Sequence, residues 1–192
     1  MWIHLITLNR MGDIVSDTKY YVTYNTIHKA VKELSKKVIA SGFDPDLIVA
    51  IGSGGFIPAR IMKTFINRPI FAVGISYYGI DNRHMKVPQK IQWIDEVEQK
   101  LKGKKILLID EVDDTRVTLS YCVHELLRHQ PEEIAILVIH NKKKKKEAEF
   151  PPEIKHYYPA KEIEDRWIKY PWDAENIDEH DKSAKRMKEN NV

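Results

Sequence analysis

The sequence of 192 residues contains one cysteine and no long apolar run. Cys122 cannot form a disulfide within the chain, and its place in an apolar pattern indicates a small buried side chain in a reducing compartment. No stretch approaches the ~20 apolar residues that span a bilayer, which excludes an integral membrane protein. The apolar opening, residues 1–8, lacks a basic leader and a cleavage site. We therefore expect a cytoplasmic protein without membrane partners.

The net charge is low and unevenly distributed. The chain carries 31 lysines and arginines against 28 aspartates and glutamates, and much of the formal charge of +3 lies in the run 142–146. This balance indicates neither a nucleic-acid-binding surface nor an acidic chain, so no nucleic-acid partner is expected. There is no internal repeat, dinucleotide fingerprint or Walker loop, since Gly52-Ser53-Gly54-Gly55 lacks the Gly-Lys-Ser/Thr ending.

Length and hydrophobic pattern predict a single α/β domain. Apolar runs predict buried strands at 47–51, 70–75, 106–109 and 134–139, and helical periodicity predicts helices at 24–41, at 56–67 and after 118. Residues 76–95 predict a long loop or hairpin, and the polar residues 174–192 predict a frayed helix or a disordered tail. Strands that alternate with helices imply a parallel twisted sheet flanked by helices, which binds ligands beyond the carboxyl ends of its strands.

The segment 106–118 carries most of the chemical information. Asp110 and Glu111 directly follow a buried strand, where carboxylates accept hydrogen bonds from sugar hydroxyls and help to position a divalent cation. The residues that follow open a helix, whose amino terminus presents unpaired N–H groups, and Thr115 and Thr118 add hydroxyl donors. Acids beside a phosphate-binding turn predict a sugar phosphate ligand.

This segment resembles the phosphoribosyl pyrophosphate (PRPP) signature of type I phosphoribosyltransferases, a hydrophobic strand, two acids and then Asp-Thr-Gly-x-Thr. Arg116 stands where most of the family has glycine, although Asp-Glu-Val-Asp-Asp-Thr-Arg is similar to the variant of fungal-type hypoxanthine-guanine enzymes. An arginine takes positive φ less freely than glycine, but its charge could neutralise a phosphate.

The resemblance implies a role for each residue of the signature. Asp110 and Glu111 would hold the ribose of PRPP, with Glu111 also a ligand of Mg²⁺, and Asp114 would be the catalytic acid or base at purine N7. The 5′-phosphate cradle would consist of Thr115, Arg116, Val117 and Thr118.

Two further segments are expected to contact pyrophosphate. Alone, Ser53, Gly54 and Gly55 would be a tight connection, but beside the signature they resemble the pyrophosphate loop of xanthine-guanine and fungal-type enzymes. The resemblance implies a peptide bond between Ser53 and Gly54 that is cis or poised to become so. Residues 76–87 resemble the mobile loop of bacterial xanthine-guanine enzymes. In that loop Arg83 would contact pyrophosphate, or else would be a solvent-facing arginine.

The base site is expected near the carboxyl end of the chain. Residues 167–173 resemble the Trp-Ile-x-x-Pro-Trp-Asp/Glu ending of the purine enzymes, which implies that Trp167 stacks on the base and that Ile168 supplies backbone contacts. Lys142 matches the lysine that donates to the purine O6 and N7 side and so selects 6-oxopurines over adenine. Lys143 to Lys146 predict a solvated loop.

Together these features imply a purine salvage enzyme, which converts PRPP and hypoxanthine, guanine or xanthine to the nucleoside 5′-monophosphate and pyrophosphate. It would require Mg²⁺ and form a homodimer or homotetramer. The alternative is a non-catalytic regulator of the same fold that senses PRPP or a nucleotide. The expected organisation is an appendage at 1–15, a core at 16–140, a base-binding hood at 141–175 and a polar tail at 176–192.

Overall fold

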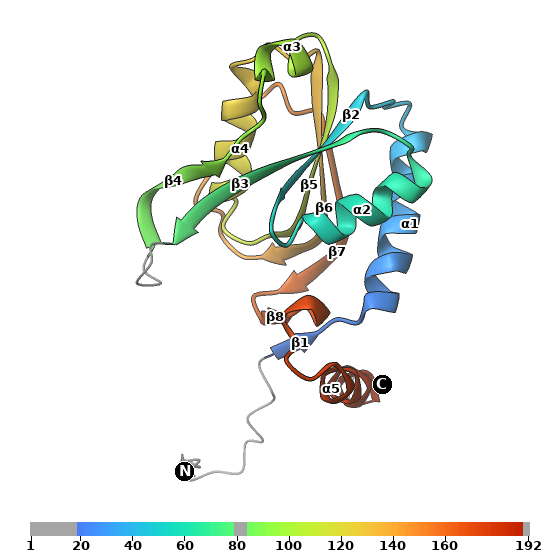
Figure 1. Cartoon of the computed structure of the whole chain (residues 1–192). Coiled ribbons are helices and arrows are strands. Elements are labelled where there is room, and N and C mark those ends of the chain that lie inside the picture. The colour runs from blue at the N-terminus through green and yellow to red at the C-terminus, as the bar shows by residue number, and fades with distance from the viewer. Residues whose placement is uncertain (1–18, 79–83, 190–192) are drawn as a thin grey trace.

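The computed structural model describes residues 19–78 and 84–189, which fold around a twisted six-stranded sheet of order β4-β3-β2-β5-β6-β7 (Figure 1). Five strands run parallel, and β4 pairs antiparallel with β3 at one edge. The strands are β2 (Leu47–Gly52), β3 (Ile70–Tyr78), β4 (His84–Gln92), β5 (Lys105–Asp113), β6 (Glu133–Lys143) and β7 (His156–Glu164). The predicted α/β class is confirmed.

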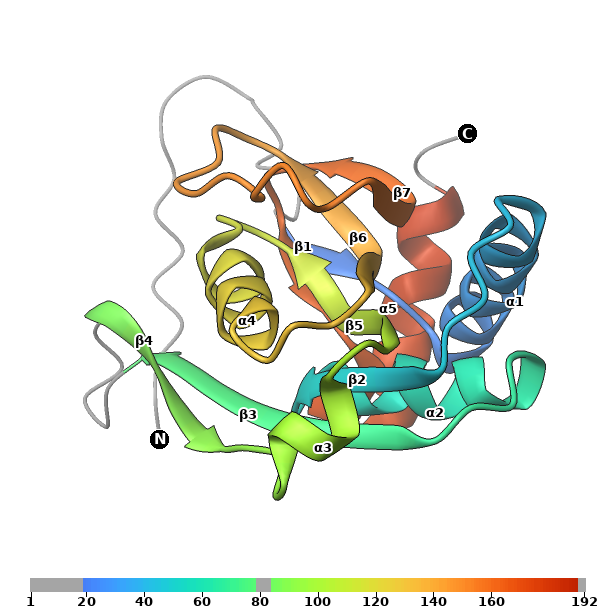
Figure 2. The ribbon, with the colours of Figure 1, turned by 90° about the horizontal axis from the view of Figure 1, so that it is seen from above.

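Helices cover both faces of the sheet (Figures 1 and 2). Helices α1 (Tyr24–Ala40) and α2 (Phe56–Phe65) lie on one face, and α3 (Val97–Leu101) and α4 (Val117–Leu127) lie on the other. Successive side chains of β5 alternate between the two resulting cores, with Leu107 and Ile109 in one and Ile106 and Leu108 in the other. A strand buried on both faces explains the uninterrupted apolar run in the sequence.

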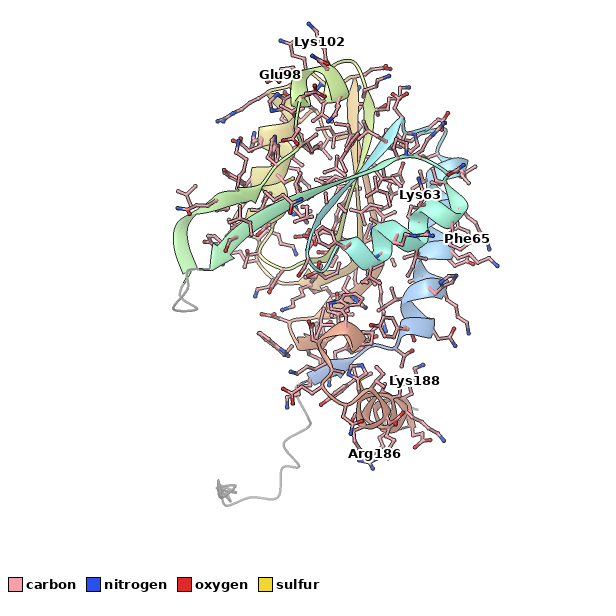
Figure 3. All side chains as sticks on the ribbon, in the orientation of Figure 1. Lys63, Phe65, Glu98, Lys102, Arg186 and Lys188 are labelled. Atoms are coloured by element: carbon pink, nitrogen blue, oxygen red, sulfur yellow. The ribbon has the colours of Figure 1, made fainter. Side chains whose placement is uncertain are left out.

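The amphipathic pattern of residues 24–41 forms α1 as predicted. Thr23 caps its amino end, since the Thr26 N–H donates to the Thr23 hydroxyl at 3.2 Å. Labelled polar side chains such as Lys102 and Arg186 point outward from the cores (Figure 3). No helix within the described ranges is both long and apolar enough to cross a bilayer.

A second, two-stranded sheet joins the two ends of the described chain. Strand β1 (Lys19–Tyr21) pairs in parallel with β8 (Trp167–Lys169), and the 3₁₀ helix η1 (Pro171–Asp173) follows. Helix α5 (Ile177–Glu189) packs on β1, where the His180 ring nitrogen Nε2 lies 2.8 Å from the Val22 carbonyl. A disordered tail was therefore the wrong alternative for these residues.

The small sheet lies beyond the carboxyl ends of the main strands (Figure 1). The division between core and hood at residue 140 stays a prediction. Strand β7, which follows this residue in the chain, belongs to the main sheet. Residues 76–78 and 84–92 belong to the paired strands β3 and β4, whereas the appendage at 1–15 and the tip of the predicted mobile loop, including Arg83, lie outside the described residues.

Candidate active site

A cleft of about 300 Å³ lies at the carboxyl ends of β2, β3 and β5. It is the edge at which parallel sheets of this kind bind ligands. The predicted site residues that line it are Ser53, Gly54, Asp110, Glu111, Asp114, Thr115, Arg116 and Thr118. Sequence reasoning assigned no site role to Tyr77 at the end of β3, which also lines the cleft.

The two acids of β5 lie against the glycine turn that follows β2. A Cβ atom at Gly54 would overlap the Glu111 carboxyl group, so only glycine fits there with Glu111 in this position. Asp110 is buried, and its Oδ1 accepts a hydrogen bond from the Glu111 N–H at 2.9 Å. Burial, followed by the negative charge of Glu111, raises the pKa of Asp110 well above its usual range.

This pair fits a divalent cation. Oxygen Oε2 of Glu111 is buried and has no hydrogen-bond partner within the described part of the chain. A cation would satisfy this oxygen and relieve the excess negative charge that raises the pKa of Asp110. Mg²⁺ commonly takes one or two carboxylates from a protein and completes its shell with water and substrate phosphates, so two acids suffice.

The turn after β2 differs by one peptide bond from the prediction. The cis bond joins Gly52 and Ser53, not Ser53 and Gly54. Pairing with β3 continues through Gly52, so the chain leaves the strand at the next bond. Gly55 lies behind the cleft, where a Cβ atom would come 2.5 Å from the Ile51 carbonyl oxygen. Its place in the turn is therefore fixed by packing on the strand.

The amino terminus of α4 closes the other side of the cleft. Arg116 immediately precedes the helix in the left-handed conformation, with φ of 73°, and Val117 is the first helical residue. The Arg116 guanidinium donates from Nε and Nη2 to Asp113 Oδ2 at 3.0 and 2.9 Å. Asp113 is thus the partner of the Arg116 charge in this structure, and the expected neutralisation of a bound phosphate by Arg116 stays a prediction.

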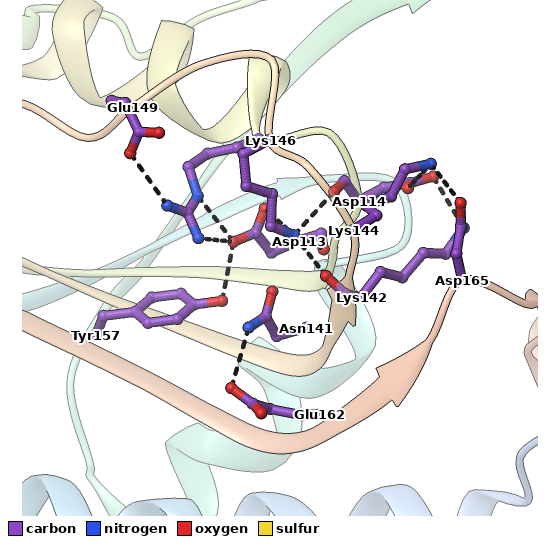
Figure 4. A network of polar contacts seen from close by, with 11 residues as sticks. Asp113, Asp114, Asn141, Lys142, Lys144, Lys146, Glu149, Tyr157, Glu162 and Asp165 are labelled. Carbon is purple, nitrogen blue, oxygen red and sulfur yellow. Dashed lines mark hydrogen bonds and ion pairs between the residues drawn. The ribbon is translucent and has the colours of Figure 1, made fainter.

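Two lysines meet the carboxylate predicted to be catalytic (Figure 4). Lys142 Nζ lies 3.0 Å from Asp114 Oδ2, and Lys144 Nζ lies 3.1 Å from Asp114 Oδ1. Asp165, which sequence reasoning did not find, also pairs with Lys144 at 3.0 Å, and this contact lowers the pKa of Asp165. Lys142 therefore lies beside Asp114, as a shared role at one edge of a base requires.

The hood attaches to the acid-bearing strand through buried polar groups. The Tyr170 hydroxyl donates to the Glu111 carbonyl oxygen at 3.0 Å and lies 2.9 Å from His140 Nδ1. Tyr170 also stacks on Trp172, with ring centroids 4.6 Å apart. Trp167, by contrast, is 66% exposed and does not line the cleft, which leaves its ring face open to a ligand. His140 was not among the predicted site residues. Its position directly after the apolar run 134–139 was the feature of the sequence that could have indicated it.

Comparisons with known proteins show the family of this chain. The family model "Phosphoribosyl transferase domain" matches residues 21–183. Xanthine phosphoribosyltransferase 1 of Saccharomyces cerevisiae is 39% identical over 90% of this chain and 98% of its own length. The hypoxanthine-guanine phosphoribosyltransferase of Schizosaccharomyces pombe is 40% identical over 88% of this chain and 96% of its own.

Solved structures give the same result. A hypothetical protein from Neisseria gonorrhoeae with bound ppGpp is 42% identical, with a TM-score of 0.81 over 88% of this chain and 96% of that one. A purine phosphoribosyltransferase from Pyrococcus horikoshii is 26% identical, with a TM-score of 0.65 over 83% of this chain and 97% of that one. The chain belongs to the phosphoribosyltransferase family, as predicted. None of these relatives supports the alternative of a non-catalytic regulator.

Proposed function

We propose that this protein transfers the phosphoribosyl group of PRPP to N9 of a 6-oxopurine and releases pyrophosphate. The observation that carries the proposal is one cleft that combines the Asp110–Glu111 pair, a glycine turn and a helix amino terminus. An acid pair alone would suit many ligands. Together with two phosphate-binding turns, it matches a sugar that carries phosphate groups at both ends.

PRPP would bind with its two phosphate ends on opposite sides of the acid pair. The turn of Ser53, Gly54 and Gly55 would bind pyrophosphate, to which Arg83 is also assigned as a prediction. The backbone from Thr115 to Thr118 would bind the 5′-phosphate, since the first N–H groups of α4 have no partner within the helix. Glu111, with Asp110 beside it, would hold Mg²⁺. The cation would offset negative charge on the leaving pyrophosphate.

The base would lie between the expected hood, residues 141–175, and the loop of residues 114–118. Asp114 would exchange a proton at purine N7 and compensate positive charge on the base. Lys142 would donate to O6, and its contact with Asp114 supports a role for both groups at one edge of the base. The exposed ring of Trp167 would stack on the purine, and the backbone of Ile168 would contact the C2 side.

The relatives support a 6-oxopurine without ranking the candidates. Those named above act on xanthine, or on hypoxanthine and guanine, by their names, and the relative from Neisseria gonorrhoeae holds a guanine nucleotide. We propose that this chain accepts at least one of these three bases. A cytoplasmic location and a homodimeric or homotetrameric assembly remain predictions.

The direct test is pyrophosphate release by purified protein supplied with PRPP, Mg²⁺ and one base at a time. Hypoxanthine, guanine or xanthine should support turnover, whereas orotate should not. Lys145→Met changes an exposed residue of the same lysine run and is a matched control that should retain activity. Binding of PRPP without turnover of any base would contradict the enzyme assignment.

A further inference from the structure

Every second residue of the lysine-rich segment 142–146, which begins at the end of β6, turns inward. The Lys142 and Lys146 side chains are only 10% and 11% exposed, whereas Lys143 and Lys145 face solvent. This alternation continues the period of the strand. The prediction of a solvated loop is therefore wrong for half of the run, and Lys146 has no part in the function proposed above.

Lys146 contacts the start of the loop 114–118, which we call the phosphate loop (Figure 4). Its ammonium donates to three carbonyl oxygens, those of Asp113 at 2.8 Å, Asp114 at 2.8 Å and Lys142 at 3.0 Å. It also lies 3.3 Å from Asp113 Oδ1. Three carbonyl groups around one ammonium use all of its donors, so Lys146 ties the start of the loop to the end of β6.

Asp113 is the centre of this arrangement and is completely buried. Its Oδ2 accepts two hydrogen bonds from the Arg116 guanidinium and a third from the Tyr157 hydroxyl at 2.9 Å. Burial raises the pKa of Tyr157, so this hydroxyl keeps its proton and donates. The guanidinium also packs on the Phe150 ring, 4.4 Å from its centroid. We call Asp113, Arg116, Lys146 and Tyr157 the Asp113 cluster.

The backbone of the segment 144–150 is tied to the same loop. The Glu147 N–H donates to the Thr115 carbonyl at 3.0 Å, and the Ser120 hydroxyl of α4 donates to the Glu149 carbonyl at 2.8 Å. The loop is thus held from below by both side chains and backbone, and its cleft side remains available to a ligand.

Arg116 takes a conformation that side chains rarely adopt. Its φ of 73° lies in the left-handed region, where Cβ crowds the backbone and glycine is favoured. A non-glycine residue stays there when surrounding contacts determine it. Four partners surround the guanidinium: Asp113, Glu149, Phe150 and Tyr157. These contacts stabilise the left-handed conformation at position 116, which glycine adopts without side-chain support in the usual signature.

We propose that the Asp113 cluster fixes the phosphate loop in its left-handed turn and that Arg116 and Lys146 are positioning residues for the 5′-phosphate of PRPP. This inference rests on the proposed function for the identity of the ligand. The side chains of the cluster contact one another and the carbonyl oxygens of Asp113 and Asp114, so their effect on substrate would pass through the backbone N–H groups of the loop.

The test compares Arg116→Ala, Arg116→Gly, Lys146→Met and the control Lys145→Met. Arg116→Ala keeps a Cβ and loses the cluster, so KM for PRPP should rise about tenfold or more while kcat at saturating PRPP falls less than about threefold. Arg116→Gly needs no side-chain support to take positive φ, so its KM for PRPP should rise less than that of Arg116→Ala. Lys146→Met should resemble Arg116→Ala, and Lys145→Met should resemble wild type.

Hydrogen exchange of the loop amides separates the cluster from the enzyme assignment. In Arg116→Ala and Lys146→Met, amides of residues 114–118 should exchange faster than in wild type, with or without substrate. Failure of wild type to bind PRPP would overturn the proposed function, whereas the exchange rates would still show whether the cluster holds the loop.

An unchanged KM for PRPP in Arg116→Ala, together with unchanged exchange, would overturn the inference. A lower melting temperature in that variant with no change in KM would do the same, because it would show a purely structural role. If Arg116→Ala does not fold, Tyr157→Phe removes one donor to Asp113 and should raise KM for PRPP about threefold. An unchanged KM in that variant would then decide against the cluster.

Discussion

His140 links the stability of the hood to pH. It is 2% exposed, and its Nδ1 lies 2.9 Å from the Tyr170 hydroxyl. Because that hydroxyl gives its only proton to the Glu111 carbonyl, Nδ1 must carry a proton and donate in a neutral ring. Burial, with a smaller effect from the charge of Lys161, lowers the pKa of His140 from 6.5 to about 4.

The size of the effect follows from the two pKa values. The unfolded chain binds a proton at this histidine below pH 6.5, whereas the folded protein does so only below about pH 4. Between these values the unfolded state holds more protons, so the free energy of unfolding decreases as the pH falls. From pH 7 to pH 5 linkage gives a loss of about 2 kcal/mol from this residue.

Urea unfolding at pH 7 and pH 5 measures this loss. His140→Asn places an amide nitrogen near the position of Nδ1 and cannot be protonated, so the variant should lose about 2 kcal/mol less than wild type over this interval. Only the change with pH is compared, since the substitution also alters packing. His28→Asn, at an exposed position of α1, is the matched control. Equal losses in wild type and His140→Asn would refute the reasoning.

Three further predictions concern the cleft and the base platform. Gly54→Ala should reduce turnover about 100-fold, because its methyl group displaces the Glu111 carboxyl; a rate within threefold of wild type would contradict this. Glu111→Gln should raise the concentrations of PRPP and Mg²⁺ that give half-maximal activity, whereas Asp114→Asn should reduce kcat about 100-fold or more. Identical kinetic defects would contradict these separate roles. Trp167→Ala should raise KM for the base about tenfold, since stacking is worth about 1–3 kcal/mol, and an unchanged KM would remove Trp167 from the site.

The strands of the core and their acid-bearing turn could be predicted from the sequence because their signals are local. Residues 106–109 are apolar without interruption, as a strand buried on both faces requires, and Asp110 follows at its end. Short strands were expected after residue 139, but the bounds of β7 could not be predicted, because His156–Glu164 is a half-exposed edge strand with mixed polarity. The pairing of β1 with β8 depends on residues from opposite ends of the chain, which no local pattern reveals.

The direction of the charged side chains could not be predicted. A run of identical lysines contains no hydrophobic period, so the alternation that buries Lys146 becomes visible only in the folded chain. The Arg116 guanidinium packs on Phe150 and Tyr157, which lie far from it in sequence. The position of the cis bond depended on how far β2 pairs with β3, a matter of strand register.

The most direct test of the central claim is the ratio of kcat/KM for hypoxanthine and adenine, measured with wild type and Lys142→Met at fixed PRPP and Mg²⁺. In a closed site the Lys142 ammonium and the 6-amino group of adenine would both be donors and would face each other without an acceptor. Wild type should therefore prefer hypoxanthine at least about 100-fold. The variant should lose most of this preference while still binding PRPP. A wild-type preference for adenine, or a ratio that Lys142→Met leaves unchanged, would contradict a site built for 6-oxopurines.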